Sequence, residues 1–123
     1  MTQADKELLL KDLCARLPYK VKVQDTYYKS LEPASIWLLD LNAQCVRLFA
    51  DEGYQNIEYI KPYLFPLDKI NGDMWSEYLA TCFGGNASFP TLKSFEWCDE
   101  HHVDYRGLIH MGLAIDATGL NIY

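Results

Sequence analysis

Residues 36–49, Ile-Trp-Leu-Leu-Asp-Leu-Asn-Ala-Gln-Cys-Val-Arg-Leu-Phe, show the pattern that decides the fold class. Residues 36–41 form a short and nearly continuous apolar run, which is typical of a central strand. The polar residues 42–44 follow as a short turn, and residues 45–49 are again rich in apolar side chains. We therefore expect two antiparallel strands joined by a tight connection.

The flanking segments extend this sheet in both directions. Apolar and polar side chains alternate along residues 19–24, which predicts a half-buried strand. A turn at residues 25–26 leads to a second predicted strand at residues 27–31, and residues 56–60 supply a candidate fifth strand. Turn residues recur at short intervals along this region, which favours an antiparallel meander over parallel strands with helical crossovers.

The chain before the sheet has the features of a helix. Thr2 and Asp5 have the spacing of an amino-terminal capping box. Pro18 is expected to end this helix, because proline lacks the backbone N–H that a helix interior needs. Apolar residues at helical spacing define its predicted buried stripe: Leu10, Leu13, Cys14 and Leu17.

The segment after the candidate fifth strand contains two prolines. Pro62 and Pro66 flank residues 63–65. Proline removes a ladder donor and restricts the residue before it, so we expect an ordered connector here rather than a central strand.

Two helices are predicted beyond this connector. The first opens at residues 71–73 and is closed by the glycines at residues 84–85. Its apolar stripe comprises Trp75, Tyr78, Leu79 and Cys82. The second begins at Pro90, and its stripe comprises Thr91, Phe95, Cys98 and His102. Asp104 can cap a last short helix that Gly112 ends.

These elements predict one α+β domain over residues 1–123. It comprises an amino-terminal helix, a small antiparallel sheet of four or five strands, and two or three carboxy-terminal helices packed on one face of the sheet. Half of the residues are apolar, which is enough for a core of its own.

The distribution of charge along the chain narrows the classes of molecule that the protein is expected to bind. Residues 1–30 carry six basic and four acidic residues, a local charge of 6 − 4 = +2, and residues 31–123 carry 5 − 13 = −8. The net charge of −6 disfavours nucleic acid as a partner, because most of the surface repels phosphate.

Compartment is inferred from the amino-terminal charges and the cysteines. The charges within the first fifteen residues exclude the apolar centre of a signal peptide, and no run approaches the ~18 apolar residues of a membrane span. We expect a cytoplasmic protein without membrane contact. Its cysteines are expected to be reduced and mostly buried: Cys14, Cys45, Cys82 and Cys98.

Residues 98–106 hold the densest polar chemistry in the chain. The candidate functional cluster comprises Cys98, His101, His102, Asp104 and Arg106. Three chemical functions of this cluster are considered: metal binding by the thiol and imidazoles, nucleophilic attack by the thiol with an imidazole base, and hydrolysis by a carboxylate pair. None of these sets is complete at this spacing.

A structural reading of the same cluster is therefore preferred. It places His102 in the core, uses Asp104 as a helix cap and pairs Arg106 with Asp99 or Glu100. We expect no catalytic residue, no bound metal and no cofactor.

Cations and aromatic rings alternate near the first predicted strand. This candidate nucleic-acid strip comprises Tyr19, Lys20, Lys22, Tyr27 and Lys29, with Tyr28 beside them. Such a combination can hold a single strand by stacking and phosphate contacts. The alternative, which we prefer, is a sheet face with tyrosines inward and lysines that protect an edge from further pairing.

Three blocks of the chain resemble one family. They are residues 11–19 with 21–23, residues 60–64, and residues 101–109 with 112–114. In this order they resemble small uncharacterised proteins of Bacteroides-group genomes and prophages. Lys20 and Phe65 depart from that pattern, which has glycine and arginine there. The resemblance implies residence on a mobile element and no particular activity.

The aromatic content suggests how such a protein works. Aromatic residues make up 14% of the chain, more than a small core can hold, so some should form an exposed partner surface. We therefore expect a non-enzymatic accessory protein that binds another protein. The alternatives are a nucleic-acid accessory protein that uses the strip at residues 19–29, and a small hydrolase or metal protein that uses residues 98–106. These patterns leave the oligomeric state and the identity of the partner open.

Overall fold

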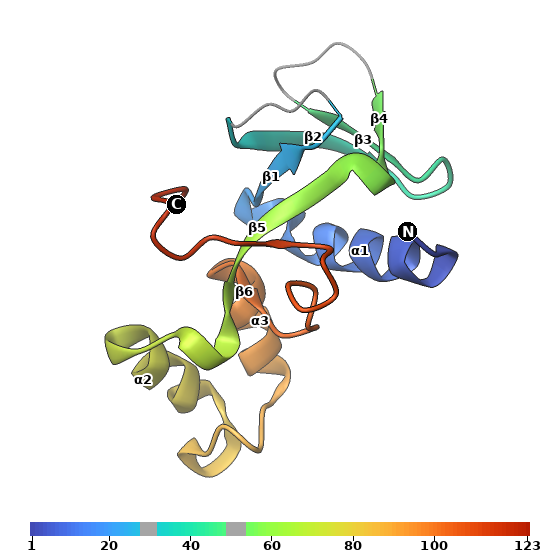
Figure 1. The fold of residues 1–123 in the computed structure, drawn as a ribbon. Helices are drawn as coiled ribbons and strands as arrows, with labels where there is room; N and C mark the ends of the chain where they lie inside the picture. Colours follow the sequence, from blue (N-terminus) through green and yellow to red (C-terminus); the bar gives the residue numbers. More distant parts are fainter. Residues whose placement is uncertain (28–31, 49–53) are drawn as a thin grey trace.

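The computed structural model describes residues 1–27, 32–48 and 54–123, and it shows an elongated α+β molecule (Figure 1). A sheet lies at one end, helix α1 crosses beneath it, and a helical hairpin forms the other end. In chain order the elements are α1 (Gln3–Arg16), η1 (Leu17–Tyr19), β1 (Lys22–Asp25), β2 (Ala34–Asp40), β3 (Cys45–Leu48), β4 (Tyr54–Asn56), η2 (Ile57–Tyr59), β5 (Ile60–Pro66), η3 (Leu67–Lys69), α2 (Gly72–Thr81), η4 (Phe83–Gly85), α3 (Leu92–Glu100), β6 (Val103–Asp104) and β7 (Ile115–Asp116).

The sheet is mixed and larger than expected. Its strand order is β4-β3-β2-β1-β5-β6, and β7 also pairs with β5. The pairs from β4 to β5 are antiparallel, whereas β6 and β7 run parallel to β5. The α+β class is confirmed, but the predicted four or five purely antiparallel strands are wrong. The short strands β6 and β7 come from carboxy-terminal segments that carry no strand pattern.

The predicted strands of the first half are found with shifted limits. The β2–β3 hairpin predicted at residues 36–49 is confirmed up to residue 48, with Leu39 opposite Val46, and residue 49 lies outside the described part of the chain. The strand predicted at residues 27–31 begins with Tyr27 in a turn, and its remaining residues lie outside the described part of the chain. The strand predicted at residues 56–60 divides into the end of β4, the 3-10 helix η2 and the start of β5.

Strand β5 contradicts the connector expected from its prolines. It spans Ile60–Pro66 and is buried along most of its length. Pro62 lies opposite Val23 in the pairing with β1, residues 63–64 then pair with β7, and residues 65–66 pair with β6. Proline is compatible with an extended backbone, and its missing N–H is tolerated at the point where neighbours change. Pro66 is the last residue of the strand, where proline likewise interrupts little.

Helix α1 begins as predicted, but its buried face is rotated. The Thr2 hydroxyl accepts from the Asp5 amide, and the Asp5 carboxylate accepts from the Thr2 amide, so the capping box is confirmed. Cys14 is exposed, which contradicts its expected place on the buried stripe. The buried residues are Leu9, Leu10, Asp12, Leu13 and Arg16. A polar pair therefore shares the face that meets the core.

Two hydrophobic clusters divide the molecule. The first lies between α1 and the sheet and includes Leu13, Val23 and Leu64. The second is formed by α2, α3 and β6, with Tyr78, Trp97 and Cys98 at its centre. The carboxy-terminal helices therefore pack mainly on each other, beyond the end of β5, rather than on a face of the sheet as expected (Figure 1).

Helix α3 begins later than its proline suggested. Thr91 caps it in a box with Ser94, and Pro90 precedes the cap. Its buried face contains Ser94, Trp97 and Cys98, whereas Phe95, expected on that face, is exposed. The chain then turns sharply, because His102 adopts a φ of +61°.

Candidate functional site

The thiol of the predicted cluster lies inside the second hydrophobic cluster. Cys98 is only 1% exposed, and burial raises the pKa of its thiol to about 12. A thiol with this pKa stays protonated at neutral pH and is a poor nucleophile and metal ligand. Cys98 therefore has the properties of a core residue.

The side chains of the two neighbouring histidines pack against different aromatic rings. His101 stacks on Trp97 with 4.3 Å between ring centroids, and its Nδ1 lies 2.9 Å from the Trp97 carbonyl oxygen. His102 stacks instead on Tyr123, at 3.7 Å and with an angle of 10° between the planes. Burial lowers the pKa of His102 to about 4, so this ring is neutral at physiological pH. His102 is half-buried and follows helix α3, rather than lying on its stripe.

Asp104 caps a turn rather than a helix. One carboxylate oxygen accepts from the amides of Arg106 and Leu108, at 3.2 and 3.1 Å, and the other accepts from Ile109 at 3.0 Å. The capping role is as expected, but residues 108–112 form turns where a short helix was predicted. The carboxylate holds this segment against the body, which occupies both oxygens with structural bonds.

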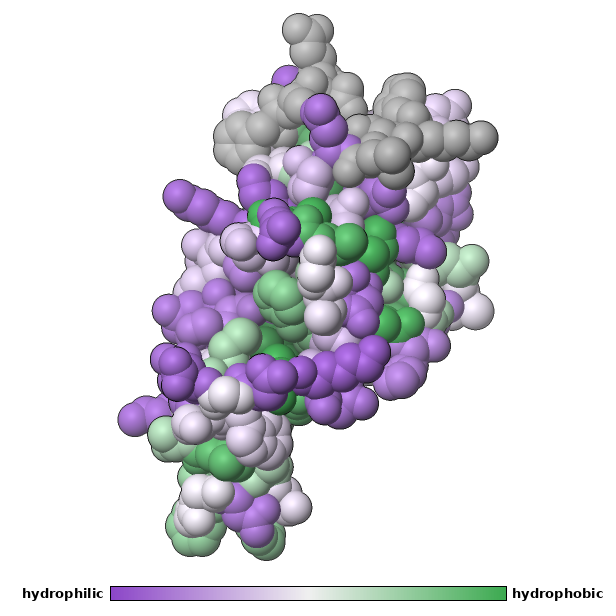
Figure 2. Space-filling view, turned by 60° about the vertical axis from the view of Figure 1, so that its left-hand side comes forward, coloured by the Kyte–Doolittle hydropathy of each residue, from purple (hydrophilic) through white to green (hydrophobic). Residues whose placement is uncertain are grey.

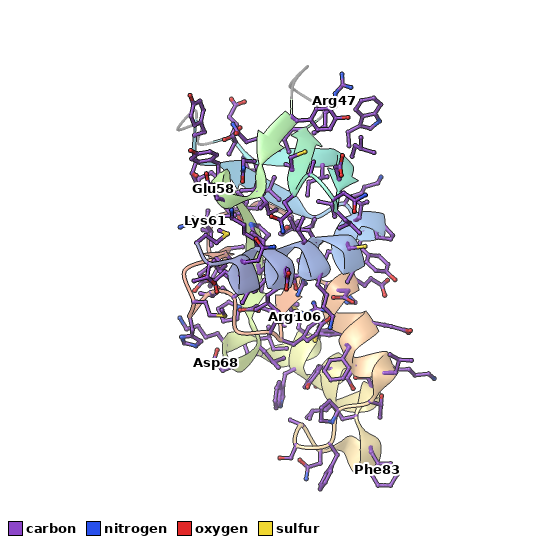
Figure 3. The ribbon with its side chains drawn as sticks, turned by 90° about the vertical axis from the view of Figure 1, so that its right-hand side faces the viewer. Arg47, Glu58, Lys61, Asp68, Phe83 and Arg106 are labelled. Atoms are coloured by element: carbon purple, nitrogen blue, oxygen red, sulfur yellow. The ribbon has the colours of Figure 1, made fainter. Side chains whose placement is uncertain are left out.

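Arg106 pairs with Asp12 on α1, not with Asp99 or Glu100. Its Nη1 lies 2.7 Å from Asp12 Oδ1, and in Figure 3 the side chain lies directly beneath α1. Asp99 instead accepts from the Tyr105 hydroxyl at 2.9 Å. Arg106 thus joins the carboxy-terminal segment to α1.

Asp12 has a second cationic partner, the fully buried Arg16. The Arg16 Nε donates to Asp12 Oδ2 at 2.9 Å, and the pair is inaccessible to solvent. The other nitrogens of Arg16 donate to the carbonyls of Cys98 at 3.1 Å and Val103 at 2.7 Å. One guanidinium therefore links α1 to the end of α3 and to β6, and we call Asp12, Arg16 and Arg106 the buried ion network.

This network explains the polar density near residues 98–106. Both carboxylate oxygens of Asp12 and all three guanidinium nitrogens of Arg16 are bonded to protein groups, so these two buried residues are not available for chemistry on a substrate. In the described part of the chain, no three His, Cys, Asp or Glu residues lie close enough to hold a metal ion. Among the helices of residues 1–27, 32–48 and 54–123, none combines the length and apolar character that crossing a membrane requires.

The lysine–tyrosine strip is dispersed over three environments. Tyr19 and Lys20 precede β1, and Lys20 has a φ of +59°. The Lys22 ammonium donates to the Ser35 hydroxyl at 3.0 Å. Tyr27 lies beyond the other end of β1, with its ring edge against a neighbouring tyrosine. Tyr28 and Lys29 lie outside the described residues.

For Lys22, the edge-protecting role that we preferred is wrong. Strand β1 lies inside the sheet, between β2 and β5. A lysine on an interior strand has no open edge to protect.

Large apolar side chains gather instead at the far end of the helical hairpin. Phe83, Phe89 and Leu92, which we call the apolar tip, are 75%, 58% and 73% exposed. Figure 3 shows Phe83 near the far end of the hairpin, directed away from the molecule, and the lower lobe in Figure 2 is mostly pale, with several green areas. No charged residue occurs between residues 78 and 92.

The loop that carries the tip is held by several hydrogen bonds. The Phe83 amide donates to the Phe89 carbonyl at 2.9 Å, which closes the loop. The Asn86 side chain accepts from the Ser88 amide at 2.9 Å, and the Thr91 hydroxyl donates to the Thr81 carbonyl at 2.7 Å. The apolar tip is therefore presented in a defined conformation.

Sequence reasoning expected an exposed aromatic surface but did not locate it. The absence of charge over residues 78–92 would have marked the segment, since 23% of the chain is charged. Comparison of the chain with protein-family models, with curated proteins and with solved structures finds no match.

Proposed function

We propose that this protein is a non-enzymatic protein-binding module, and that its apolar tip docks into an uncharged apolar groove on a partner protein. The observation that carries this proposal is the exposure of Phe83, Phe89 and Leu92 at the end of a protruding hairpin, within a stretch, residues 78–92, that contains no charged residue. Large apolar side chains that cluster on a surface are a common mark of a protein interface.

The chemistry of the tip determines the kind of partner surface. A protruding knob is complementary to a concavity, and a knob without charges enters an apolar groove with little desolvation cost. Full burial of an aromatic or leucine side chain contributes about 1.5–3 kcal/mol. Two or three such anchors, in a loop already ordered before binding, are sufficient for a specific contact.

The biological setting is a further part of this proposal. The resemblance of residues 11–19 with 21–23, 60–64, and 101–109 with 112–114 to proteins of Bacteroides-group genomes and prophages supports an accessory role on a mobile element. In that setting the partner is a protein of the element or of its host.

The test is comparative capture from cells that express the protein. Tagged wild type, the tip variant Phe83→Ser/Phe89→Ser, and the strip variant Tyr19→Ser/Tyr27→Ser are compared by quantitative mass spectrometry. All four positions are exposed aromatics, so the two variants are matched in chemistry. We expect one protein that wild type and the strip variant retain and that the tip variant loses.

Two outcomes would contradict the proposal. The first is a partner that the tip variant retains and the strip variant loses. The second is binding of the purified wild type, but not of the tip variant, to phosphatidylcholine vesicles in a flotation assay, since that would make the tip a lipid-contacting surface.

A further inference from the structure

A pocket lies where the end of β5, helix α2 and the segment after β6 meet. Its volume is about 400 Å³, within the range of sites that hold small organic molecules. The rings of Trp75 and Tyr78 line it, with 5.7 Å between their centroids, and Gly107 and Ile109 contribute further lining. The pocket therefore offers a largely apolar and aromatic surface to a ligand.

The charges around this pocket are predominantly negative. Asp68, Asp104 and Asp116 line it together with one cation, Lys69. The formal local charge is therefore −3 + 1 = −2 when the lining His110 is counted as uncharged. Lys69 Nζ lies 3.5 Å from Asp116 Oδ2. Asp68 is exposed and has no ion-pair partner within the described ranges of the chain. An unpaired carboxylate thus stands beside an aromatic wall.

We propose that this pocket binds a small organic cation, an ammonium or guanidinium group on an apolar or aromatic stem. The stem packs on Trp75 and Ile109, and the cation is held by Asp68 and by the electron-rich ring faces. This inference does not depend on docking through the apolar tip. Trp75 lies near the start of α2, whereas Phe83 lies beyond its end.

The same charges argue against other ligand classes. A carboxylate ligand would meet Asp68 and Asp116, while the cation that could attract it, Lys69, is already close to Asp116. A neutral ligand of the same shape would gain the apolar contacts without the charge interaction. The pocket should therefore rank ligands of one shape in the order cation, neutral compound, anion.

The test is an NMR titration of the ¹⁵N-labelled full chain with three compounds of similar shape. They are phenethylamine, 2-phenylethanol and phenylacetate. We expect saturable shifts at the amides of Gly107 and Ile109 and none at Phe83. Phenethylamine should bind roughly tenfold more tightly than 2-phenylethanol, a ratio that corresponds to about 1.4 kcal/mol, and phenylacetate most weakly.

Matched variants locate the two parts of the interaction. The double variant Asp68→Asn/Asp116→Asn keeps the side-chain oxygen at position 116 that accepts from the Thr118 amide at 2.9 Å. It should reduce the preference for phenethylamine over 2-phenylethanol to less than roughly threefold. Trp75→Ala should weaken the amine and the alcohol alike. Trp37→Ala, an exposed tryptophan on β2, should change neither.

Two further probes distinguish the source of the cation. Nα-acetyl-lysine amide and Nα-acetyl-arginine amide represent side chains of a protein ligand. Tighter binding of either than of phenethylamine assigns the pocket to a partner's side chain, and weaker binding assigns it to a free aryl amine. Equal affinity for phenethylamine and 2-phenylethanol, tighter binding of phenylacetate, or no saturable shift at Gly107 and Ile109 with any probe would overturn the proposal.

Discussion

Replacement of Asp12 by alanine should be among the most destabilising single substitutions in this protein. Asp12 is fully buried and forms ion pairs with two guanidinium groups, with Arg16 at 2.9 Å and Arg106 at 2.7 Å. Arg16 is equally inaccessible, so the substitution leaves a buried cation with only two carbonyl acceptors. An uncompensated buried charge costs several kcal/mol, because low-dielectric surroundings cannot replace its hydration.

The expected magnitude follows from this geometry. Removal of one partner from a buried pair costs about 3–5 kcal/mol. A domain of this size has a free energy of unfolding of about 5–15 kcal/mol, and each kcal/mol lost lowers the melting temperature by roughly 3–5 °C. Asp12→Ala should therefore lower the melting temperature by on the order of 10–20 °C. Asp12→Asn, which keeps an acceptor but no charge, should fall between this variant and wild type.

Urea denaturation followed by circular dichroism and by tryptophan fluorescence measures the effect. Glu7→Ala is the control, because Glu7 is an exposed acidic residue on the same helix, and its loss should change stability by less than about 0.5 kcal/mol. Replacement of the pair by apolar residues, Asp12→Leu/Arg16→Met, should recover part of the loss. A cost below about 1 kcal/mol for Asp12→Ala would refute the role assigned to the buried ion network.

Three further predictions concern single side chains. Because burial lowers the pKa of His102 from 6.5 to about 4, the neutral form of its ring is favoured in the folded state. The contribution of this ring to the free energy of unfolding should be complete above pH 6.5 and should be lost as the pH falls toward 4. Its size is on the order of 1–2 kcal/mol after discounting for partial exposure. Denaturation of wild type and His102→Gln across this range tests this, and equal pH dependence would contradict it. Iodoacetamide should modify exposed Cys14 in the native protein long before Cys98, whose pKa is raised to about 12. After unfolding it should modify all four cysteines. Peptide mass spectrometry that finds Cys98 modified first would contradict the burial of this thiol. Tyr123→Phe removes a hydroxyl that donates to the Tyr63 carbonyl at 2.7 Å, and it should cost about 1 kcal/mol; a calorimetric scan indistinguishable from wild type would contradict this.

Local sequence features predicted local structure well. The capping box of Thr2 and Asp5 marks the start of α1, because both partners lie within one helical turn. The β2–β3 hairpin was predictable for the same reason: its apolar runs and its turn are adjacent in sequence.

Elements defined by distant partners were not predictable in this way. Strand β5 resembles a connector, since whether Pro62 interrupts a ladder depends on which strands lie beside it. Arg106 is separated from Asp12 by most of the chain, and both Asp99 and Glu100 are closer in sequence. The nearest carboxylate was therefore the wrong partner.

The candidate site illustrates the same limitation. Residues 98–106 are rich in reactive groups, yet the fold occupies those groups with structural bonds or buries them. The apolar tip contains no reactive group at all. Its exposure depends on how α2 and α3 pack, which leaves Phe83 and Leu92 outside the core that Tyr78 and Trp97 form.

The most direct test of docking through the apolar tip is site-specific photocrosslinking in cells that express the protein. p-Benzoylphenylalanine replaces Phe83 or Phe89 at the tip, and replaces Tyr27, an exposed aromatic beside the sheet, as the control. We expect positions 83 and 89 to crosslink to the same protein and position 27 not to crosslink to it. Crosslinking from position 27 with none from positions 83 and 89 would contradict this expectation.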